Sequence, residues 1–369
     1  MKRSILILAL AMLPVLSARG DYLRVDGEHV GHTYSLLRPD GADWNQKLVL
    51  LVHGSIPQVF ESLAPVLLAE GFGVAFVTLA DGTGEGAALK QTTLQTRFVQ
   101  TRFAVEFAKP RETYLLAFSR GAHTMQKLLE TSPVRYSGAL SVCGGNGGSQ
   151  LQWDYFFTAR LLFDHYFPGV LPGTPTRLPE ISVDEFLGVL APKIAGAVFA
   201  DLGKAQEMAS VDQYALAYSG PFELAEGIVF SLAVHTIGVN GLIEAANGIP
   251  FDNRTVEYAG TGDDQALNAQ IARIAGDQQA HRYLDVWYEP RGSTAGTPVL
   301  LLHTARDPGA PEALNNDRYS ELVAGAGNQS YIERRVIDRF GHCVIDNAEV
   351  ASALADLVGW AERGAIPSN

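Results

Sequence analysis

The chain has 369 residues, 47% hydrophobic and 18% charged, and its formal net charge is −12 at pH 7. This composition predicts a globular protein with a large buried core and argues against a disordered chain. The acidic balance argues against a nucleic-acid partner, because phosphate contacts need clustered Lys and Arg. The two cysteines are too few for a disulfide scaffold and form no close pair typical of structural zinc, so we expect no metal.

The first twenty residues have the pattern of an export signal. Lys2 and Arg3 precede an apolar run over residues 5–16, and small residues end the run at Ala18-Arg19-Gly20. The run is too short to span a bilayer, which takes about 20 apolar residues. We therefore expect residues 1–20 to be a signal peptide, with a buried N-terminal helix as the alternative. The mature protein is then secreted or periplasmic, and we expect no stable membrane anchor later in the chain.

Residues 21–146 alternate between predicted strands and predicted helices. The strands are continuous apolar runs, which are typical of strands buried on both faces, at 48–52, 74–79, 113–118 and 136–142. The segments with helical spacing are 60–70, 94–107 and 123–130. This alternation predicts a mostly parallel sheet with helices on both faces.

The alternation stops at residue 147 and returns at residue 296. Residues 147–295 contain helical patterns, separated by Gly and Pro, and are rich in aromatic residues near their start. The chain then continues with predicted strands at 299–303 and 331–337 and predicted helices at 317–324 and 347–363. We expect 21–146 and 296–369 to form one α/β core. We expect 147–295 to be a mostly helical lid over the carboxyl ends of the strands, where ligands of such sheets bind.

A sharp strand-to-helix turn follows the third predicted strand and carries Ser119. Side chains two positions before and after this serine would collide with the neighbouring strand and helix, so both must be small; here they are Ala117 and Gly121. The turn exposes the hydroxyl and places it at the start of a helix, where a developing anion is stabilised. Ser119 is therefore the candidate nucleophile.

The segment Ala117-Phe118-Ser119-Arg120-Gly121 resembles the Gly-x-Ser-x-Gly motif of the α/β-hydrolase superfamily, with alanine in the first place. The resemblance extends over residues 30–145 and 296–363. It implies an α/β-hydrolase fold and a Ser-acid-His order along the chain. Asp307 follows the strand 299–303 and matches the acid, and His342 follows the strand 331–337 and matches the histidine.

In such a triad the imidazole of His342 accepts the proton of Ser119, and Asp307 orients the imidazole. Asp338 is the competing acid, although its place four residues before His342 favours a role in capping the loop. The resemblance also implies an oxyanion hole made by the backbone N–H groups of Ser55, in His53-Gly54-Ser55, and of Arg120. It requires no cofactor.

Cys143 ends the fourth predicted strand and Cys343 follows His342, so both are expected at the same rim of the sheet. In an oxidising compartment a bridge between them is expected to hold the histidine loop near the serine. Two buried free thiols are the alternative.

The predicted function is hydrolysis of a small-molecule or polymeric carboxylic ester, with Trp153, Tyr155 and Phe156 as candidate pocket-lining residues. Two alternatives remain open. One is a peptidase or amidase, in which an acidic lid residue binds the amine of the substrate; the candidates are Asp154, Asp164, Glu180, Asp184 and Glu185. The other is a non-catalytic binding protein, which the presence of all three triad residues disfavours. The sequence does not indicate an oligomeric state.

Overall fold

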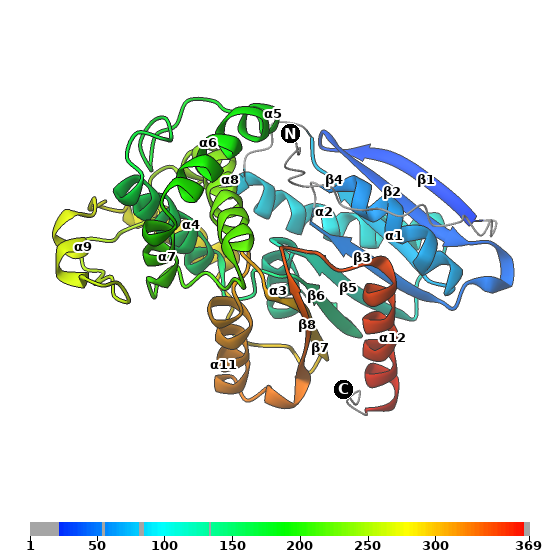
Figure 1. Cartoon of the computed structure of the whole chain (residues 1–369). Coiled ribbons are helices and arrows are strands. Elements are labelled where there is room, and N and C mark those ends of the chain that lie inside the picture. The colour runs from blue at the N-terminus through cyan, green and yellow to red at the C-terminus, as the bar shows by residue number, and fades with distance from the viewer. Residues whose placement is uncertain (1–21, 54–55, 81–84, 133, 365–369) are drawn as a thin grey trace, which may run out of the picture.

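The computed structural model describes residues 22–53, 56–80, 85–132 and 134–364, and side chains at 85–88 are outside this description (Figure 1). Within these ranges the strands form one eight-stranded sheet of order β1-β2-β4-β3-β5-β6-β7-β8. Their bounds are β1 (Tyr22–His29), β2 (His32–Pro39), β3 (Lys47–Val52), β4 (Gly73–Thr78), β5 (Glu112–Phe118), β6 (Gly138–Val142), β7 (Val299–Arg306) and β8 (Ile332–Phe340). Strands β3 to β8 run parallel, and β2 is antiparallel to both β1 and β4. The mostly parallel sheet predicted from the alternation is therefore confirmed.

The β1–β2 hairpin at one edge of the sheet has no counterpart among the predicted strands. Most side chains of β1 are exposed, because the strand pairs on one side with β2 alone. It therefore lacks the continuous apolar run by which the other strands were recognised. An edge strand of this kind is specified by its partner and less by its own hydrophobicity.

Helices cover both faces of the sheet. On one face α1 (Pro57–Ala69) and α12 (Asn347–Arg363) bury an apolar stripe that includes Phe60 and Leu357. On the other face lie α2 (Glu85–Glu106), α3 (Gly121–Thr131) and α11 (Arg318–Gly325). The bounds of α12 match the predicted helix 347–363, since a capping box formed by Asp346 and Glu349 specifies its start. Each fully buried side chain of this kind contributes about 1.5–3 kcal/mol.

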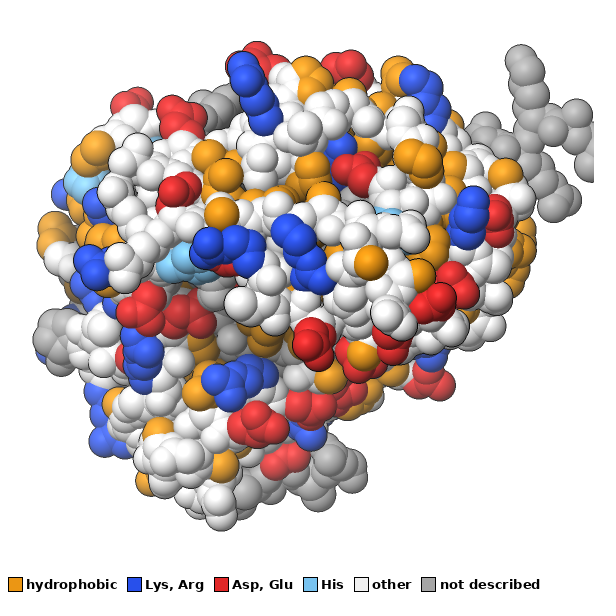
Figure 2. Space-filling model, turned by 90° about the vertical axis from the view of Figure 1, so that its left-hand side faces the viewer, with side chains coloured by type: hydrophobic (Ala, Val, Ile, Leu, Met, Phe, Trp, Pro, Cys, Tyr) orange, Lys and Arg blue, Asp and Glu red, His pale blue; other side chains and the backbone are white. Residues whose placement is uncertain are grey.

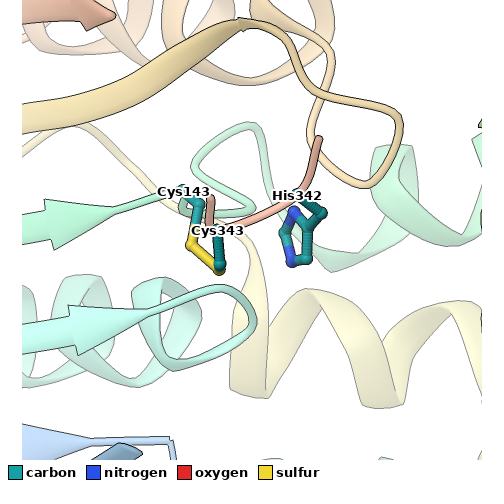
Figure 3. A group of neighbouring side chains, drawn as sticks. All are labelled: Cys143, His342 and Cys343. Atoms are coloured by element: carbon teal, nitrogen blue, oxygen red, sulfur yellow. A yellow bond between two sulfur atoms is a disulfide. The ribbon is translucent and has the colours of Figure 1, made fainter. Parts of the chain in front are cut away.

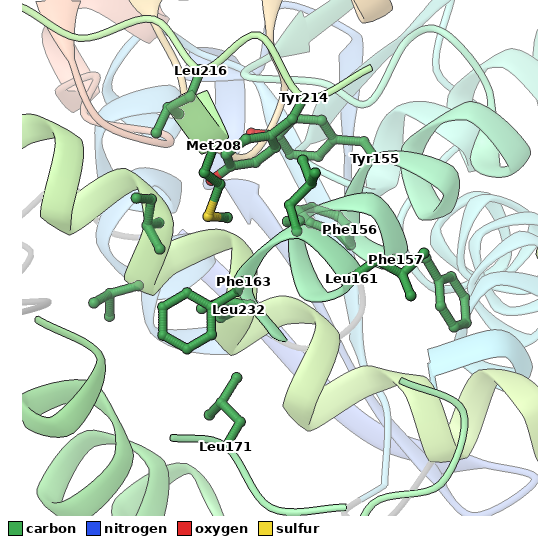
Figure 4. Packing of buried hydrophobic residues seen from close by; sticks show 14 of the residues in the cluster. Tyr155, Phe156, Phe157, Leu161, Phe163, Leu171, Met208, Tyr214, Leu216 and Leu232 are labelled. Carbon is green, nitrogen blue, oxygen red and sulfur yellow. The ribbon is translucent and has the colours of Figure 1, made fainter. Parts of the chain in front are cut away.

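Between β6 and β7 the described chain is built from helices. Their bounds are α4 (Ser149–Tyr166), α5 (Val183–Glu185), η2 (Phe186–Leu190), α6 (Ala191–Ala200), α7 (Leu202–Ser210), α8 (Pro221–Ala246), α9 (Asp264–Gln270) and α10 (Gln278–Tyr288). We call this part, residues 147–295, the insert. It has a hydrophobic core of its own, in which aromatic residues of α4 pack against α7 and α8 (Figure 4). The sequence analysis noted the aromatic residues near the start of the insert but did not predict the helix α4 on which they lie.

Helix α8 is the longest described helix of the insert. By length and composition it is apolar enough to cross a membrane, as is the pair Val183–Ala200 and Leu202–Ser210, which bends by 100°. Half of the most apolar 18-residue stretch of α8 is buried inside the protein. Helix α8 packs on α4 and α6 within the insert and on α2 of the sheet core, so its apolar composition fits a core helix.

Candidate active site

Ser119 lies at the turn between β5 and α3 in a left-handed backbone conformation, with φ of +49°. Its N–H donates to the carbonyl of Val142 at 3.0 Å, which connects the turn to the end of β6. A Cβ atom on Gly121 would lie 2.0 Å from the carbonyl oxygen of Val52. Only glycine fits there, which is the steric requirement predicted from the sequence. The surrounding strands thus hold a non-glycine residue in a conformation that costs about 1–3 kcal/mol.

The structure brings Ser119, His342 and Asp307 into one hydrogen-bonded chain. The Oγ atom of Ser119 lies 2.7 Å from Nε2 of His342. The Nδ1 atom of the same ring lies 2.8 and 3.0 Å from the two carboxylate oxygens of Asp307. Asp307 follows β7 and His342 follows β8, so the two groups come from neighbouring parallel strands.

The carboxylate of Asp307 is buried and held by the loop that follows it. Its Oδ1 atom accepts hydrogen bonds from the N–H groups of Gly309 at 2.7 Å and Ala310 at 3.0 Å. A buried carboxylate needs such donors to compensate for the water it has lost. The loop therefore supplies the donors that the buried carboxylate needs and orients it toward the imidazole.

Ser119, Asp307 and His342 follow one another along the chain and lie just after strands β5, β7 and β8. The strand order of the sheet is β1-β2-β4-β3-β5-β6-β7-β8. This chain has the α/β-hydrolase fold. In this α/β-hydrolase fold, the candidate site lies at the carboxyl ends of the parallel strands, where ligands of open α/β sheets bind.

No protein-family model matches the chain, and no curated protein matches it in sequence. Among solved structures, it is similar to feruloyl esterase B from Aspergillus oryzae, with 12% identity over 94% of this chain and 81% of that one and a TM-score of 0.47. Carboxyl esterase 2 from Tuber melanosporum has 12% identity over 93% and 88%, with a TM-score of 0.46. A bacterial membrane phospholipase A has 13% identity over 93% and 87%, with a TM-score of 0.45. The strand order, and not these distant likenesses, establishes the fold.

The oxyanion hole was predicted to consist of the backbone N–H groups of Ser55 and Arg120. Ser55 lies outside the described residues. Arg120 directly precedes α3, so its backbone N–H belongs to the helix start beside Ser119. Close by, burial, together with the positive charge of Arg120, holds the pKa of His53 well below its usual value. A histidine whose pKa is lowered in this way stays neutral near neutral pH, which fits a structural role better than that of a charged group.

Asp338, the competing acid, is exposed and engaged by an arginine. Its side chain is 88% exposed and forms an ion pair with Arg306 at 2.7 Å. Arg306 also pairs with Glu223 of α8, at 3.3 Å, so this arginine links the end of β7 to the insert. Asp338 therefore belongs to the rim of the site.

The insert contributes a residue that the sequence did not single out. The ring of Phe230, in the middle of α8, lies 5.1 Å from the ring of His342, centroid to centroid. Between them Gly309 leaves the space free, since a Cβ atom there would lie 2.6 Å from Nδ1 of His342 and 2.7 Å from the Phe230 ring. Nothing in the apolar pattern of α8 distinguishes Phe230 from its neighbours, because only packing brings it to the imidazole.

The three predicted pocket-lining residues lie in the packed interior of the insert. Trp153, Tyr155 and Phe156 are at most 5% exposed, and the Phe156 ring packs edge to face with the rings of Trp153 and Tyr155. Figure 4 shows Tyr155 and Phe156 among the buried residues of this core. The Tyr155 hydroxyl donates to the carbonyl of Pro308 at 3.0 Å, next to Asp307. Tyr155 thus contacts the loop that holds the acid, and contact of the three residues with a substrate stays a prediction.

A disulfide joins Cys143 to Cys343, as the sequence predicted against the alternative of two free thiols (Figure 3). Both sulfur atoms lie within 4.8 Å of a ring nitrogen of His342. Such a grouping resembles a metal site, but sulfur atoms joined to each other offer no thiolate ligands.

Two buried carboxylates of the insert have strongly shifted pKa values. Burial raises the pKa of Asp154 to about 7 and that of Glu289 to about 7. The Oε1 atom of Glu289 accepts from the N–H of Gln150 at 2.7 Å, near the start of α4, and the Gln150 amide donates to Asp154 at 2.8 Å. Burial is the main cause of both shifts, and the charge of Glu289 adds to the shift of Asp154, so these carboxylates make the stability of the insert dependent on pH.

Figure 2 shows the insert side of the molecule, where acidic and basic side chains are interspersed with apolar ones. Phe199 at the end of α6 and Phe222 at the start of α8 form an exposed ring pair, 5.4 Å apart, and Phe222 is 77% exposed. Phe222 lies on the same helix as Phe230 but is exposed to solvent, which makes it a natural control for Phe230.

Proposed function

We propose that this chain is a serine hydrolase that cleaves carboxylic esters through an acyl-enzyme on Ser119. The observation that carries the proposal is the hydrogen-bonded chain from Ser119 through His342 to Asp307. A hydroxyl in contact with an imidazole, which is in turn oriented by a buried carboxylate, is the arrangement that activates a serine nucleophile.

In the first half-reaction, Oγ of Ser119 attacks the ester carbonyl carbon while Nε2 of His342 takes the hydroxyl proton. The negative charge moves to the carbonyl oxygen, next to the backbone N–H of Arg120 and, by prediction, that of Ser55. One such donor is worth on the order of 3 kcal/mol in the transition state. When the bond to the alcohol breaks, the imidazolium returns its proton to the leaving oxygen.

In the second half-reaction, His342 takes a proton from a water molecule that attacks the acyl-enzyme. The bond to Ser119 breaks, the proton returns to Oγ, and the carboxylic acid leaves. Asp307 stabilises the imidazolium in both steps and is not itself protonated.

The same proposal includes export. The disulfide supports it, because such bonds persist in oxidising compartments. The signal peptide predicted at residues 1–20 lies outside the described residues. Secretion or a periplasmic location is tested by N-terminal sequencing of the exported protein, which we expect to begin near residue 21.

Labelling with a fluorophosphonate probe tests the nucleophile. We expect the parent protein to be labelled and to hydrolyse short p-nitrophenyl esters, and the Ser119→Ala variant to do neither. The exposed Ser210 gives a matched control, and Ser210→Ala should label like the parent. An unlabelled parent protein would contradict the proposal and favour the binding-protein alternative.

Aminoacyl anilides separate the esterase from the peptidase alternative, and we expect no hydrolysis of them. Two of the acidic residues considered for binding a substrate amine are already engaged. Asp164 pairs with the buried Arg160 at 2.8 Å, and Asp154 accepts from Gln150. Glu180, Asp184 and Glu185 are exposed on the insert.

A further inference from the structure

We propose that the Cys143–Cys343 disulfide positions the imidazole of His342 between Ser119 and Asp307, so that the state of this bond controls the rate of the reaction. The inference rests on the proposed function. It deepens that function by adding two positioning residues, which do not touch the substrate but act through the histidine next to them.

The histidine loop needs a constraint because it leaves an edge of the sheet. Strand β8 is the last strand, and His342 and Cys343 are both partly exposed. On the N-terminal side the loop is held by Gly341, whose N–H donates to the carbonyl of Arg306 at 3.0 Å and whose carbonyl accepts from the Thr304 hydroxyl at 2.7 Å. On the C-terminal side the nearest covalent constraint is the disulfide at Cys343.

The backbone at Cys343 has a conformation that requires such a constraint. Its φ is +56°, in the left-handed region that a cysteine enters only at a cost. Residues keep this conformation where the surrounding structure over-determines it. A bridge to a fixed partner supplies that determination one residue from the imidazole.

The partner is well fixed. Cys143 is fully buried, its N–H donates to the carbonyl of Leu302 in β7 at 2.8 Å, and it directly follows Val142, whose carbonyl accepts the N–H of Ser119. The end of β6 therefore holds the nucleophile by a hydrogen bond and the histidine loop by a covalent bond. The disulfide thus reaches past the end of β7 and joins the loop after β8 to the strand end that holds Ser119. Figure 3 shows the two cysteines and the imidazole of His342 together at this point.

The imidazole is also constrained from the insert side, by Phe230. A packed ring limits tilting but does not stop the loop from moving outward. Loss of the bridge should therefore lengthen the contacts of His342 with Ser119 and Asp307 while the sheet remains intact. A misplacement of about 1 Å costs about 100-fold in rate.

The test compares the oxidised protein with the same protein treated with dithiothreitol. The dithiol passes two electrons and two protons to the bond, so two thiols form and the reductant closes into a cyclic disulfide. The chain has two cysteines, so the reagent has no other disulfide to reduce. We expect kcat for p-nitrophenyl butyrate to fall by about 10- to 100-fold and KM to change by less than about threefold. Reoxidation should restore kcat.

The double variant Cys143→Ala/Cys343→Ala is the matched control. It should show the same low kcat without reductant and no response to reductant, while circular dichroism shows a folded protein. A spectroscopic measurement reports the position of the imidazole without catalysis. The downfield NMR resonance of the Nδ1 proton shared with Asp307 should be present in the oxidised protein and lost on reduction.

A reduced, folded protein with unchanged kcat and an unchanged Nδ1 resonance would overturn the inference. Unfolding of both the reduced protein and the double variant would also overturn it, because the bridge would then hold the fold and not the imidazole. If the oxidised protein neither labels nor hydrolyses esters, the proposed function fails by itself. The Nδ1 resonance still decides whether the disulfide positions His342.

Discussion

The sheet core and the insert reach the candidate site in different ways. Ser119, Asp307 and His342 each end a strand, so the hydrogen-bond ladder of the sheet decides where they meet. Phe230 and Tyr155 come from helices, and their positions depend on how the apolar faces of the insert pack. The backbone of the sheet thus brings the three triad residues together, while side-chain packing in the insert determines which residues lie next to them. Substitutions in the two regions test this division.

The acid should be the residue most sensitive to a minimal change. We expect Asp307→Asn to lower kcat by about 10⁴-fold, because an amide favours the wrong tautomer of His342 while keeping the shape of the carboxyl group. Asp338→Asn is the control and should change kcat by less than about twofold, since Asp338 faces solvent and Arg306. The measurement is the steady-state rate with p-nitrophenyl butyrate. A larger loss in Asp338→Asn would assign the acid to β8.

Replacing a glycine by alanine should change stability in opposite directions at Gly121, in the sheet core, and at Gly196, in the insert. Gly121→Ala should destabilise the protein by about 3 kcal/mol and displace Ser119, because the new Cβ would collide with the Val52 carbonyl. Gly196→Ala, in α6, should instead stabilise by about 0.5–1 kcal/mol, since its Cβ would meet nothing within 4 Å. Urea unfolding of both variants measures the difference. Equal effects would mean that the turn at Ser119 is not tightly packed.

The insert should affect the reaction through Phe230. We expect Phe230→Ala to lower kcat/KM by about tenfold, which corresponds to the loss of about 1.4 kcal/mol of packing between the two rings. Phe222→Ala on the same helix should change kcat/KM by less than about twofold, because Phe222 is largely exposed. Indistinguishable variants would show that α8 contributes to the site only as a scaffold.

The free energy of unfolding should depend on pH through Asp154, and Asp154→Asn should remove this contribution. Burial raises the pKa of Asp154 to about 7 from 3.8, so the folded state holds a proton that the unfolded state releases between about pH 4 and 7. The free energy of unfolding from this group therefore falls as the pH rises through that window. Asp154→Asn should stabilise by about 1–3 kcal/mol at pH 8 and by nothing near pH 4.

Urea unfolding at pH 4, 6 and 8 checks this expectation. The exposed Asp184→Asn variant should differ from the parent by less than about 0.5 kcal/mol at each pH. A gain for Asp154→Asn that does not grow with pH would show that the carboxylate stays ionised throughout.

Much of the sheet was predictable because burial on both faces leaves continuous apolar runs. The runs at 48–52 and 113–118 became β3 and β5 with ends shifted by at most one residue. The hairpin β1–β2 was missed, since the edge strand β1 is mostly exposed and the apolar residues of β2 are interrupted by polar ones. In the insert, α4 was visible only as an aromatic cluster. Helix α4 buries polar residues such as Thr158 and Arg160 together with its aromatic ones, so it lacks the one-sided apolar spacing on which a sequence-based assignment depends.

The order of the chemical groups could be recognised in the sequence: a serine between small residues at a strand end, then an acid and a histidine at later strand ends. The two cysteines could be placed as well, one after the fourth predicted strand and one next to the histidine. The folded chain was needed to show that Phe230 lies against His342, that Trp153 and Phe156 lie inside the insert, and that Asp338 faces solvent. Strand ends are positioned by a repeating backbone ladder that local sequence encodes. Contacts between helices depend on the packing of many side chains at once, which no local pattern records.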